Sequence, residues 1–588
     1  MSKTVLKRAS YFLVSFVLIF SLMTFFVYDN EAVLNFNLVS AITVFVILLG
    51  LCVAEKKYGY FSMIFSGIRN ERKFFVDLSK SNKRFLSFLH GVNLAVTISY
   101  VAAVVALIML GHYSKVSILC VFWGSVLAIA LQLLDRILTG KGMEHARLFV
   151  LVTVLAGLMM CYTIPTTIYV SWDDETHFRR AYDLLHLFDN ERPWGISRIL
   201  VYNGLPVDKY IADPQAFVQE MVYHGLEEVE FAPRLCNPYN AFAYLPMMAV
   251  MTLFSLIGSD VVTLVVACRL INVLVYAGIV YSGIRRLKSG ATIFSAVCLM
   301  PCALYLACSI NYDFWLTAWV AYAFAYTISI LQDPEKKFCK MDFIMILGAF
   351  FLGCGPKAIY CAMILPMLLI PNEKFESKDQ AKRFRVWTLL VIGLIVATLL
   401  IPGLIVPDIY TDHRGGENVS SAGQISFILS NPFRYAHILL RFLSEFCSFS
   451  QFNTWSGYFA YLGNPHMAFG SFACLLLVFC TFTDRGKDGN HYEKMQWIRW
   501  GTLFVAFVQL VLVATALYVG FTPIGSETVN GVSYRYIFPL LAPICFFLAP
   551  AKLKCEINPK LQSALVYGGL ALTVLFAFFN SYIGKFSL

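Results

Sequence analysis

Three carboxylates and a histidine stand together in one short run, 171–178, directly after an apolar stretch, 148–170, that is long enough to cross a bilayer. Charges at that density are costly in lipid, so we expect them at the membrane surface, where water reaches them. A carboxylate there could act as a general base toward a hydroxyl group, or the cluster could hold a divalent cation. The alternative is that these acids only flank the end of the membrane span and have no chemical role, and the density of acids argues against it. The residues are Asp173, Asp174, Glu175 and His177.

The histidine and one lysine offer groups that could contact an anion. His177 follows Asp174 by three residues, about one helical turn, so the two side chains can share a helix face. It could orient a carboxylate or touch a phosphate, and a histidine bonded only to solvent is the alternative. Lys357 interrupts what would otherwise be one apolar stretch, 343–370. A lysine in that setting needs a partner, for which a phosphate is suited, although snorkelling to the interface is the alternative.

Three further polar residues fall at predicted span boundaries. Arg535 precedes an apolar run, and its planar guanidinium suits phosphate oxygens. Tyr534 beside it could bind substrate, but a tyrosine there also fits the aromatic belt of any membrane protein. Asp313 lies at a turn between two predicted spans and could hold an acceptor, with a polar hairpin turn as the alternative.

The composition predicts an all-α polytopic membrane protein. Of the 588 residues, 59% are hydrophobic and 14% charged, whereas a soluble protein carries about 25% charged residues. Long apolar runs recur along the chain, and the alternation typical of barrel strands is absent from the sequence. The net charge of +10 comes from basic residues in short hydrophilic gaps, as the positive-inside rule expects, so a nucleic-acid partner is not indicated. The 16 cysteines show no metal-binding spacing and suit packing.

We predict about 15 transmembrane helices (range 14–16), with amphipathic interfacial helices in external loops. One such helix is expected over 174–188, because its apolar residues recur with helical periodicity. The predicted spans are 11–27, 38–54, 92–110, 116–134, 148–170, 261–284, 292–309, 315–331, 343–353, 359–370, 387–405, 469–483, 502–518, 537–548 and 565–579.

The basic gaps give these spans a direction. The gaps 55–84 and 136–147 are strongly basic and are therefore expected in the cytoplasm, together with the N-terminus. The span 148–170 then ends outside. The stretch 239–257 is ambiguous, but treating it as interfacial or re-entrant keeps every later basic gap inside. The same count of membrane crossings, which keeps the later basic gaps in the cytoplasm, predicts that 432–452 is a second interfacial helix.

This topology predicts one site on the extracytoplasmic face. It brings the acidic run to the same side of the membrane as Asp313, Lys357 and Arg535, which are far apart in sequence. We divide the chain into an N-terminal module of four spans (1–147), a catalytic module with a large external loop at 171–236 (148–406), and a C-terminal region (407–588).

The order of these features resembles the GT-C superfamily of integral-membrane glycosyltransferases. More narrowly, the chain is similar to a bacterial family of polytopic proteins known only as a domain of unknown function. That family carries a Pro-Asp-Glu-x-x-His-Phe-type motif, which here reads Trp172-Asp173-Asp174-Glu175-Thr176-His177-Phe178. Further matches are Asn237-Pro238-Tyr239, Asp313, Lys357 and Arg535-Tyr536-Ile537-Phe538-Pro539. Trp172 stands where Pro is usual and Asp174 where Glu is usual, which leaves open which acid is the base.

The resemblance implies sugar transfer on the outer face of a bacterial plasma membrane, with inversion. The donor would be a polyprenyl-phosphate-linked sugar and the acceptor a lipid-linked or cell-envelope polysaccharide. Asp173 or Asp174 would be the base, and Lys357 and Arg535 would hold the lipid phosphate. Relatives differ in whether they need a divalent cation, so Mg²⁺ or Mn²⁺ at Asp173 and Asp174 stays open. The alternatives are a transporter or flippase of lipid-linked glycans, or a polysaccharide polymerase or ligase.

Overall fold

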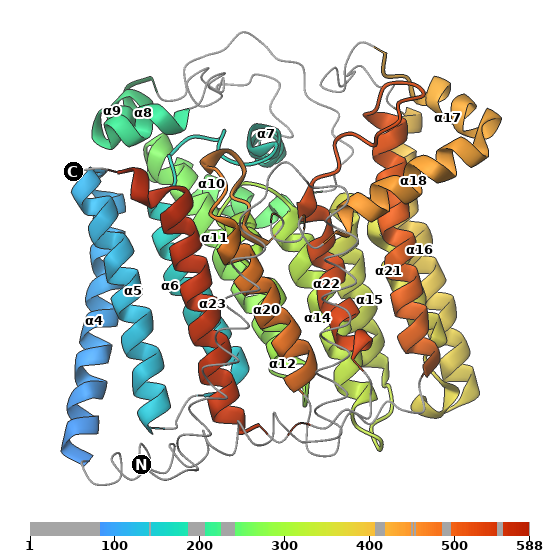
Figure 1. Cartoon of the computed structure of the whole chain (residues 1–588), viewed down its shortest axis with the longest axis horizontal. Helices are drawn as coiled ribbons and strands as arrows, with labels where there is room; N and C mark the ends of the chain where they lie inside the picture. The colour runs from blue at the N-terminus through green and yellow to red at the C-terminus, as the bar shows by residue number, and fades with distance from the viewer. Residues whose placement is uncertain are drawn as a thin grey trace, which may run out of the picture.

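The computed structural model is a bundle of helices that lie side by side (Figure 1). It describes residues 83–139, 143–185, 206–224, 241–405, 418–448, 451, 454, 456–484, 496–549, 555 and 557–586. Within these ranges eight helices are long and apolar enough to cross a membrane, three apolar helices are shorter, and no strand occurs beyond one isolated bridge. The predicted all-α polytopic class is confirmed, while the predicted spans 11–27 and 38–54 lie outside the described residues.

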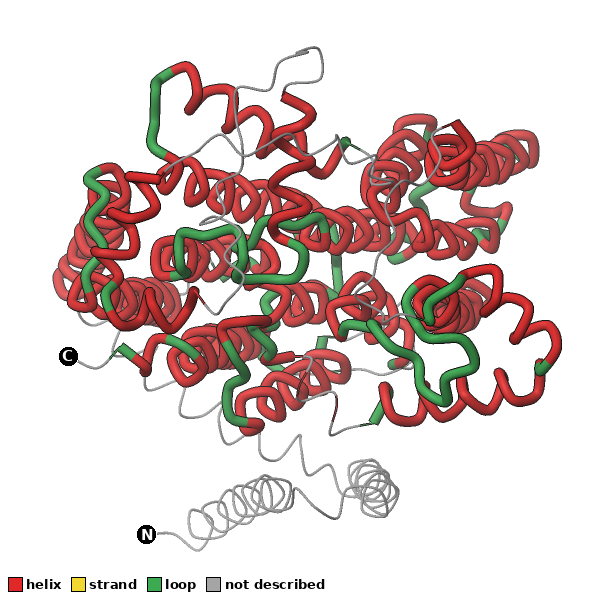
Figure 2. Tube along the Cα trace, turned by 90° about the horizontal axis from the view of Figure 1, so that it is seen from above, coloured by secondary structure: helices red, strands yellow, loops and turns green. Residues whose placement is uncertain are grey.

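The helices that run along the bundle follow most of the predicted spans. Viewed from above, most of them are seen end-on, so they run roughly parallel (Figure 2). They are α4 (Lys83–Met109), α5 (Lys115–Thr139), α6 (His145–Thr163), α11 (Val261–Ile284), α14 (Asp313–Leu331), α15 (Lys340–Cys354), α16 (Lys378–Ile405), α20 (Met467–Thr483), α21 (Gln496–Gly520), α22 (Phe538–Leu548) and α23 (Pro559–Ser581).

Short helices gather at one end of the bundle, which we call the upper end after its place in Figure 1. The helix α7 matches the amphipathic helix predicted over 174–188. The helix α10 has 12 residues and spans only about 18 Å, too little to cross a bilayer, in agreement with the interfacial or re-entrant prediction. The helix α18 falls within the predicted interfacial stretch 432–452. The short helices are α7 (Asp174–Leu185), α8 (Pro206–Ala212), α9 (Pro214–His224), α10 (Leu245–Leu256), α17 (Ser421–Ser430) and α18 (Pro432–Phe446).

Lys357 lies at the tip of a helical hairpin. The helix α15 leads upward, and the segment η2 (Gly355–Leu369) leads back. Their lower ends are joined because the Phe338 N–H donates to the carbonyl of Lys374 at 2.8 Å. The chain therefore reverses around Lys357, which has non-helical angles of φ −140° and ψ 78°. This hairpin accounts for the two adjacent spans predicted at 343–353 and 359–370.

The predicted span 292–309 is wrong as a single helix. The structure has two short helices, α12 (Ala291–Cys298) and α13 (Pro301–Ala307), separated by Leu299 and Met300. A proline lacks the N–H that would continue the preceding helix, and Pro301 stands in the first turn of the second helix, where that N–H is not needed. Both helices are fully buried in the bundle.

The predicted catalytic module and the C-terminal region share one hydrophobic core. The helix α23 packs against α5 and α6 from the N-terminal half of the chain. At the upper end, the Tyr582 hydroxyl donates to the carbonyl of Thr163 at 2.9 Å. A site at this end can therefore draw residues from both parts of the chain.

Candidate active site

An arginine joins two acids that come from distant parts of the chain. The Arg535 Nη2 atom lies 3.0 Å from Asp173 Oδ2, and its Nη1 atom lies 3.3 Å from Asp313 Oδ2. The side chains of Arg535 and Asp313 are each 5% exposed, whereas that of Asp173 is 24% exposed. The two acids thus compensate the buried guanidinium, and only Asp173 keeps appreciable access to solvent.

Each of these three residues lies at the start of a helix. Asp173 immediately precedes α7, Asp313 is the first residue of α14, and Arg535 lies in the short η7 segment (Tyr534–Ile537) before α22. The side-chain oxygen of Asn311 accepts from the Asp313 N–H at 2.9 Å and fixes that turn. The negative carboxylate of Asp313 also suits the positive N-terminal end of α14.

Asp173 has an unusual backbone conformation. Its φ is +59°, in the left-handed region that non-glycine residues rarely adopt. Such residues cost free energy and cluster at functional sites, because the surrounding structure must hold them in place. Here the neighbouring contacts are the bond from the Ser171 N–H to Asp174 and the ion pair to Arg535. The strain marks Asp173 as a candidate functional residue.

Asp174 is buried and accepts a hydrogen bond from the backbone. Its side chain is completely buried, and its Oδ2 accepts from the Ser171 N–H at 2.9 Å. Burial raises the pKa of Asp174 well above its ordinary value, although Arg269 opposes the shift. The hydrogen bond from Ser171 to Asp174 therefore stabilises the turn that contains Asp173. Glu175 follows in the first turn of α7 and is partly buried.

His177 connects α7 to the segment before α10. Its Nδ1 lies 2.8 Å from the Tyr244 hydroxyl, and its ring meets the edge of Tyr312 at 4.9 Å. Burial lowers the pKa of His177 to about 3 despite the nearby Asp173. A neutral imidazole suits positioning of α7 better than binding of a phosphate anion.

Lys357 lies beside Arg535, across a shared aromatic ring. Its ammonium is 3.2 Å from the centre of the Tyr536 ring, and the Arg535 guanidinium carbon is 5.3 Å from the same centre. The Tyr360 hydroxyl donates to the backbone carbonyl of Tyr536 at 2.6 Å and anchors the backbone that carries this ring. Lys357 makes no ion pair with a carboxylate of the described residues. The structure thus brings both predicted cations together.

Aromatic residues that sequence reasoning did not select complete the surroundings. The Arg535 guanidinium lies 5.2 Å from the centre of the Trp172 ring, which stacks on Tyr458 at 5.2 Å. Tyr536 belongs to the Ser-Tyr-Arg-Tyr run, but a tyrosine at a span boundary is typical of any membrane protein. Trp172 opens the acidic motif but has no predicted role there, and no pattern in the sequence distinguishes Tyr458 from other interfacial aromatics.

Tyr534, a predicted substrate-binding residue, contacts the region of α18. Its hydroxyl donates to the Gln451 side chain, and its ring stacks on Phe446 of α18 at 5.5 Å. These contacts attach the interfacial helix α18 to the start of α22. Its role in substrate binding stays a prediction.

Arg269 positions the segment that leads to Asp173. This fully buried residue of α11 donates to the carbonyls of Ile164, Pro165 and Thr167 at 3.3, 2.9 and 2.7 Å. Because α6 ends at Thr163, these carbonyls have no helical partner and need a donor. Sequence reasoning missed Arg269, although an arginine inside a predicted span was the available signal.

The acids do not form a recognisable metal cluster in the described part of the chain. No group of three or more histidine, cysteine, aspartate or glutamate residues there could hold a metal ion. Asp173 pairs with Arg535, while Asp174 accepts from a backbone N–H, so the two carboxylates have different partners. The arrangement can therefore provide a base and two cations.

A comparison with protein families gives one match. The model of a family described as "Predicted membrane protein (DUF2142)" matches residues 225–544, which is more than half of the chain. The matched region contains Asp313, Lys357 and Arg535 and begins after the acidic run. No curated protein and no solved structure matches the chain.

Proposed function

We propose that this chain, which belongs to the DUF2142 family of predicted membrane proteins, is an integral-membrane glycosyltransferase of the GT-C type. It transfers a sugar from a polyprenyl-phosphate-linked donor to a lipid-linked or cell-envelope polysaccharide acceptor. The supporting observation is the convergence of a strained, partly exposed acid with two cations at one end of the bundle. These are Asp173, Arg535 and Lys357, and each comes from a separate part of the chain.

Asp173 is the proposed general base. Its ion pair with Arg535 stabilises the negative charge that a base requires, and its partial exposure leaves room for an acceptor. Asp174 is a poorer candidate, because it is completely buried and burial favours its protonated form. Of the two acids between which the sequence motif left the choice open, we therefore propose Asp173.

Arg535 and Lys357 are the proposed partners of the donor phosphate. The Arg535 Nε atom is buried and has no hydrogen-bond partner among the described residues. An unpaired buried N–H costs free energy, which an oxygen of a bound phosphate would offset. The Lys357 ammonium rests on an aromatic ring and has no carboxylate partner among the described residues, so its charge is also available to an anion.

The proposed reaction is a single displacement. The Asp173 carboxylate accepts the proton of the acceptor hydroxyl, whose oxygen attacks the anomeric carbon of the donor sugar. The bond between that carbon and the phosphate oxygen breaks, and its electron pair leaves with the polyprenyl phosphate. Lys357 and Arg535 stabilise the negative charge on the leaving phosphate. A single displacement inverts the configuration at the anomeric carbon.

Charge distribution supports an extracytoplasmic site. The lower end of the bundle carries exposed basic side chains, and basic loops are typical of the cytoplasmic side. Lys288 there pairs with Asp333 at 3.2 Å, and Lys336 and Arg383 belong to the same end. The site lies at the opposite end, so we place it outside the plasma membrane with the N-terminus in the cytoplasm.

A transporter or flippase of lipid-linked glycans is the second candidate. The interrupted α12–α13 segment favours it, because transporters bind substrates at broken helices. Such sites carry charged or polar ligands near the bilayer midplane, yet 291–307 contains no charged residue. The ion pairs of Arg535 with Asp173 and Asp313 lie instead at the upper end, which favours the enzyme. A polysaccharide polymerase or ligase would share this site and differ only in the acceptor.

Sugar transfer by purified protein tests the proposal. We expect Asp173→Asn to abolish transfer from a polyprenyl-phosphate sugar, while Glu220→Gln, which neutralises an exposed acid of α9, leaves it unchanged. Thermal unfolding checks that both variants fold. If the folded Asp173→Asn variant transfers sugar at the wild-type rate, Asp173 is not the base. If the wild type moves intact lipid-linked glycan between leaflets without transferring sugar, the protein is a transporter and the glycosyltransferase proposal is wrong.

A further inference from the structure

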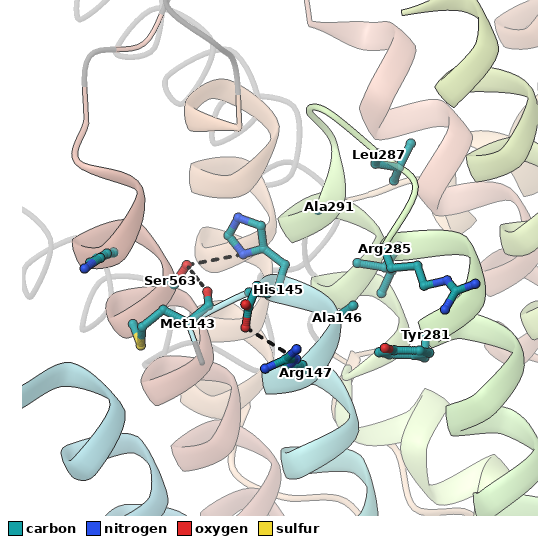
Figure 3. A pocket seen from close by; sticks show the side chains of 12 residues that line it. Met143, His145, Ala146, Arg147, Tyr281, Arg285, Leu287, Ala291 and Ser563 are labelled. Atoms are coloured by element: carbon teal, nitrogen blue, oxygen red, sulfur yellow. Dashed lines mark hydrogen bonds and ion pairs between the residues drawn. The ribbon is translucent and has the colours of Figure 1, made fainter. Parts of the chain in front are cut away.

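A cavity lies at the lower end of the bundle, away from the candidate active site, and Figure 3 shows the side chains that line it. It has a volume of about 590 Å³, within the range of ligand-binding pockets. It forms where the first turn of α6, the last turn of α11 and the first turns of α23 meet. Because α6 leads upward to Asp173, its first residue lies at the end opposite to the proposed chemistry.

Basic side chains from three helices line this cavity. Arg147 comes from α6, Arg285 follows α11, and Lys560 belongs to α23. Arg147 lies 3.6 Å from Glu144, and both side chains are largely exposed. Arg285 contacts the Tyr281 ring at 5.6 Å, but neither Arg285 nor Lys560 forms an ion pair with a described residue. The cavity therefore has excess positive charge.

The N-terminal end of α6 adds to this positive potential. The capping residue Glu144 makes no side-chain hydrogen bond to the first turn. The exposed N–H groups and the helix dipole at such an end favour an anion. The Ser563 hydroxyl, within 3.3 Å of His145 Nδ1, also lines the cavity and can donate or accept.

The remaining wall of the cavity is apolar. Met143, Ile284, Leu287 and Ala291 lie alongside the basic residues. A soluble anion gains little from such a wall, whereas a phospholipid presents a charged headgroup next to hydrocarbon. Basic pockets between transmembrane helices suit the headgroups of anionic lipids.

We propose that this cavity binds the phosphate of an anionic phospholipid. Arg285 and Lys560 contact the phosphate, and the apolar wall receives the glycerol backbone and the start of the acyl chains. The site is separate from the one proposed for sugar transfer, and the binding measurement does not depend on any enzymatic activity. A soluble phosphate ester offers the same charge without the acyl chains, so the test must separate these two sources.

Native mass spectrometry of the full-length protein in detergent can test this proposal. The probes are dioleoyl phosphatidylglycerol, dioleoyl phosphatidylcholine and glycerol 3-phosphate. We expect the wild type to retain phosphatidylglycerol in preference to phosphatidylcholine, and excess glycerol 3-phosphate not to displace it. Each cation contributes about 1 kcal/mol, so Arg285→Gln and Lys560→Gln should each weaken binding about fivefold.

The matched control is Arg383→Gln, which removes an exposed cation from the same end of the bundle but outside the cavity. It should leave lipid binding unchanged. Equal retention of the two lipids by the wild type would overturn the proposal, whatever the folding state of the variants. Equal losses in the control and the cavity variants would also overturn it, because the attraction would then be general. Displacement by glycerol 3-phosphate would overturn the lipid assignment in favour of a soluble ligand.

Discussion

The guanidinium of Arg535 lies 3.0 Å from the carboxylate of Asp173, although the two residues are 362 positions apart in the sequence. Arg535 also pairs with Asp313, so one cation holds together the starts of α7, α14 and α22. The pair links the acidic run after α6 to the C-terminal part of the chain. Its integrity should therefore affect both stability and the proposed chemistry.

Replacement of Arg535 by lysine should impair the protein even though the charge is kept. A lysine is a single point charge that cannot bond two carboxylates through a planar fork. Asp313 would remain buried without its partner, and breaking a buried pair costs about 3–5 kcal/mol. We expect a lower thermal unfolding midpoint in detergent and loss of sugar transfer. The double variant Arg535→Gln/Asp313→Asn should unfold at a higher temperature than Arg535→Gln alone, and additive effects would show that the two side chains are not coupled.

Asp174 and Asp173 should respond differently to the same substitution. Asparagine resembles a protonated aspartate and can still accept from the Ser171 N–H. Asp174→Asn should therefore retain sugar transfer, whereas Asp173→Asn should not. Burial raises the pKa of Asp174 in the folded protein, whereas the unfolded chain ionises at about 3.8. As the pH rises above that value, ionisation of the unfolded chain lowers the stability of the folded state. The midpoint of Asp174→Asn relative to wild type should then increase with pH, and a constant difference would contradict its buried, protonated assignment.

The stability of the wild type should fall in acid partly because of His177. Its pKa is about 3 in the folded protein and 6.5 in the unfolded chain, so the unfolded state binds more protons between these values. The stabilising contribution is complete above 6.5 and decreases as the pH falls toward 3. His177→Asn keeps a polar atom near the Tyr244 hydroxyl but does not titrate. Its midpoint should fall less than that of wild type between neutral pH and pH 5, and parallel curves would show that His177 titrates normally.

Lys357 should contribute to donor binding rather than to folding. Loss of a charge-assisted contact to phosphate costs about 2 kcal/mol, so Lys357→Ala should bind farnesyl phosphate roughly 30-fold more weakly. Lys336→Ala, which removes an exposed lysine at the lower end, serves as the control and should bind normally. Unchanged affinity in a folded Lys357→Ala variant would indicate that this lysine only rests against Tyr536.

Arg269→Gln should destabilise the segment that carries Asp173. Glutamine cannot reach all three carbonyls that Arg269 holds, and unsatisfied buried carbonyls cost about 1–3 kcal/mol each. We expect a lower unfolding midpoint and reduced sugar transfer with little change in farnesyl phosphate affinity, because Lys357 and Arg535 are untouched. An equal loss of affinity for that ligand would indicate general unfolding instead of a local effect on Asp173.

The sequence predicts the helices well because lipid imposes a simple rule on length and polarity. It places Val261–Ile284 at its observed bounds and identifies Lys357 as exceptional in an apolar stretch. The interruption at Leu299 and Met300 is harder to predict, because apolar residues occupy both sides of it and Pro301 alone signals the break.

The candidate site is only partly predictable for a different reason. Topology brings Asp173, Lys357 and Arg535 to one end, but it does not say which atoms meet. The separation of roles between Asp173 and Asp174 depends on a left-handed φ of +59° and on complete burial of the second acid. Neither property follows from a run of adjacent acids. The aromatic ring of Tyr536 between the two cations is likewise visible only in three dimensions.

A structure of the full-length protein with a bound polyprenyl phosphate would test the central claim most directly. We expect the phosphate to lie within about 3 Å of both the Lys357 ammonium and the Arg535 guanidinium, with Asp173 facing the position of the transferred sugar. A phosphate bound elsewhere, with Lys357 still on the Tyr536 ring and Arg535 still paired only with Asp173 and Asp313, would contradict it.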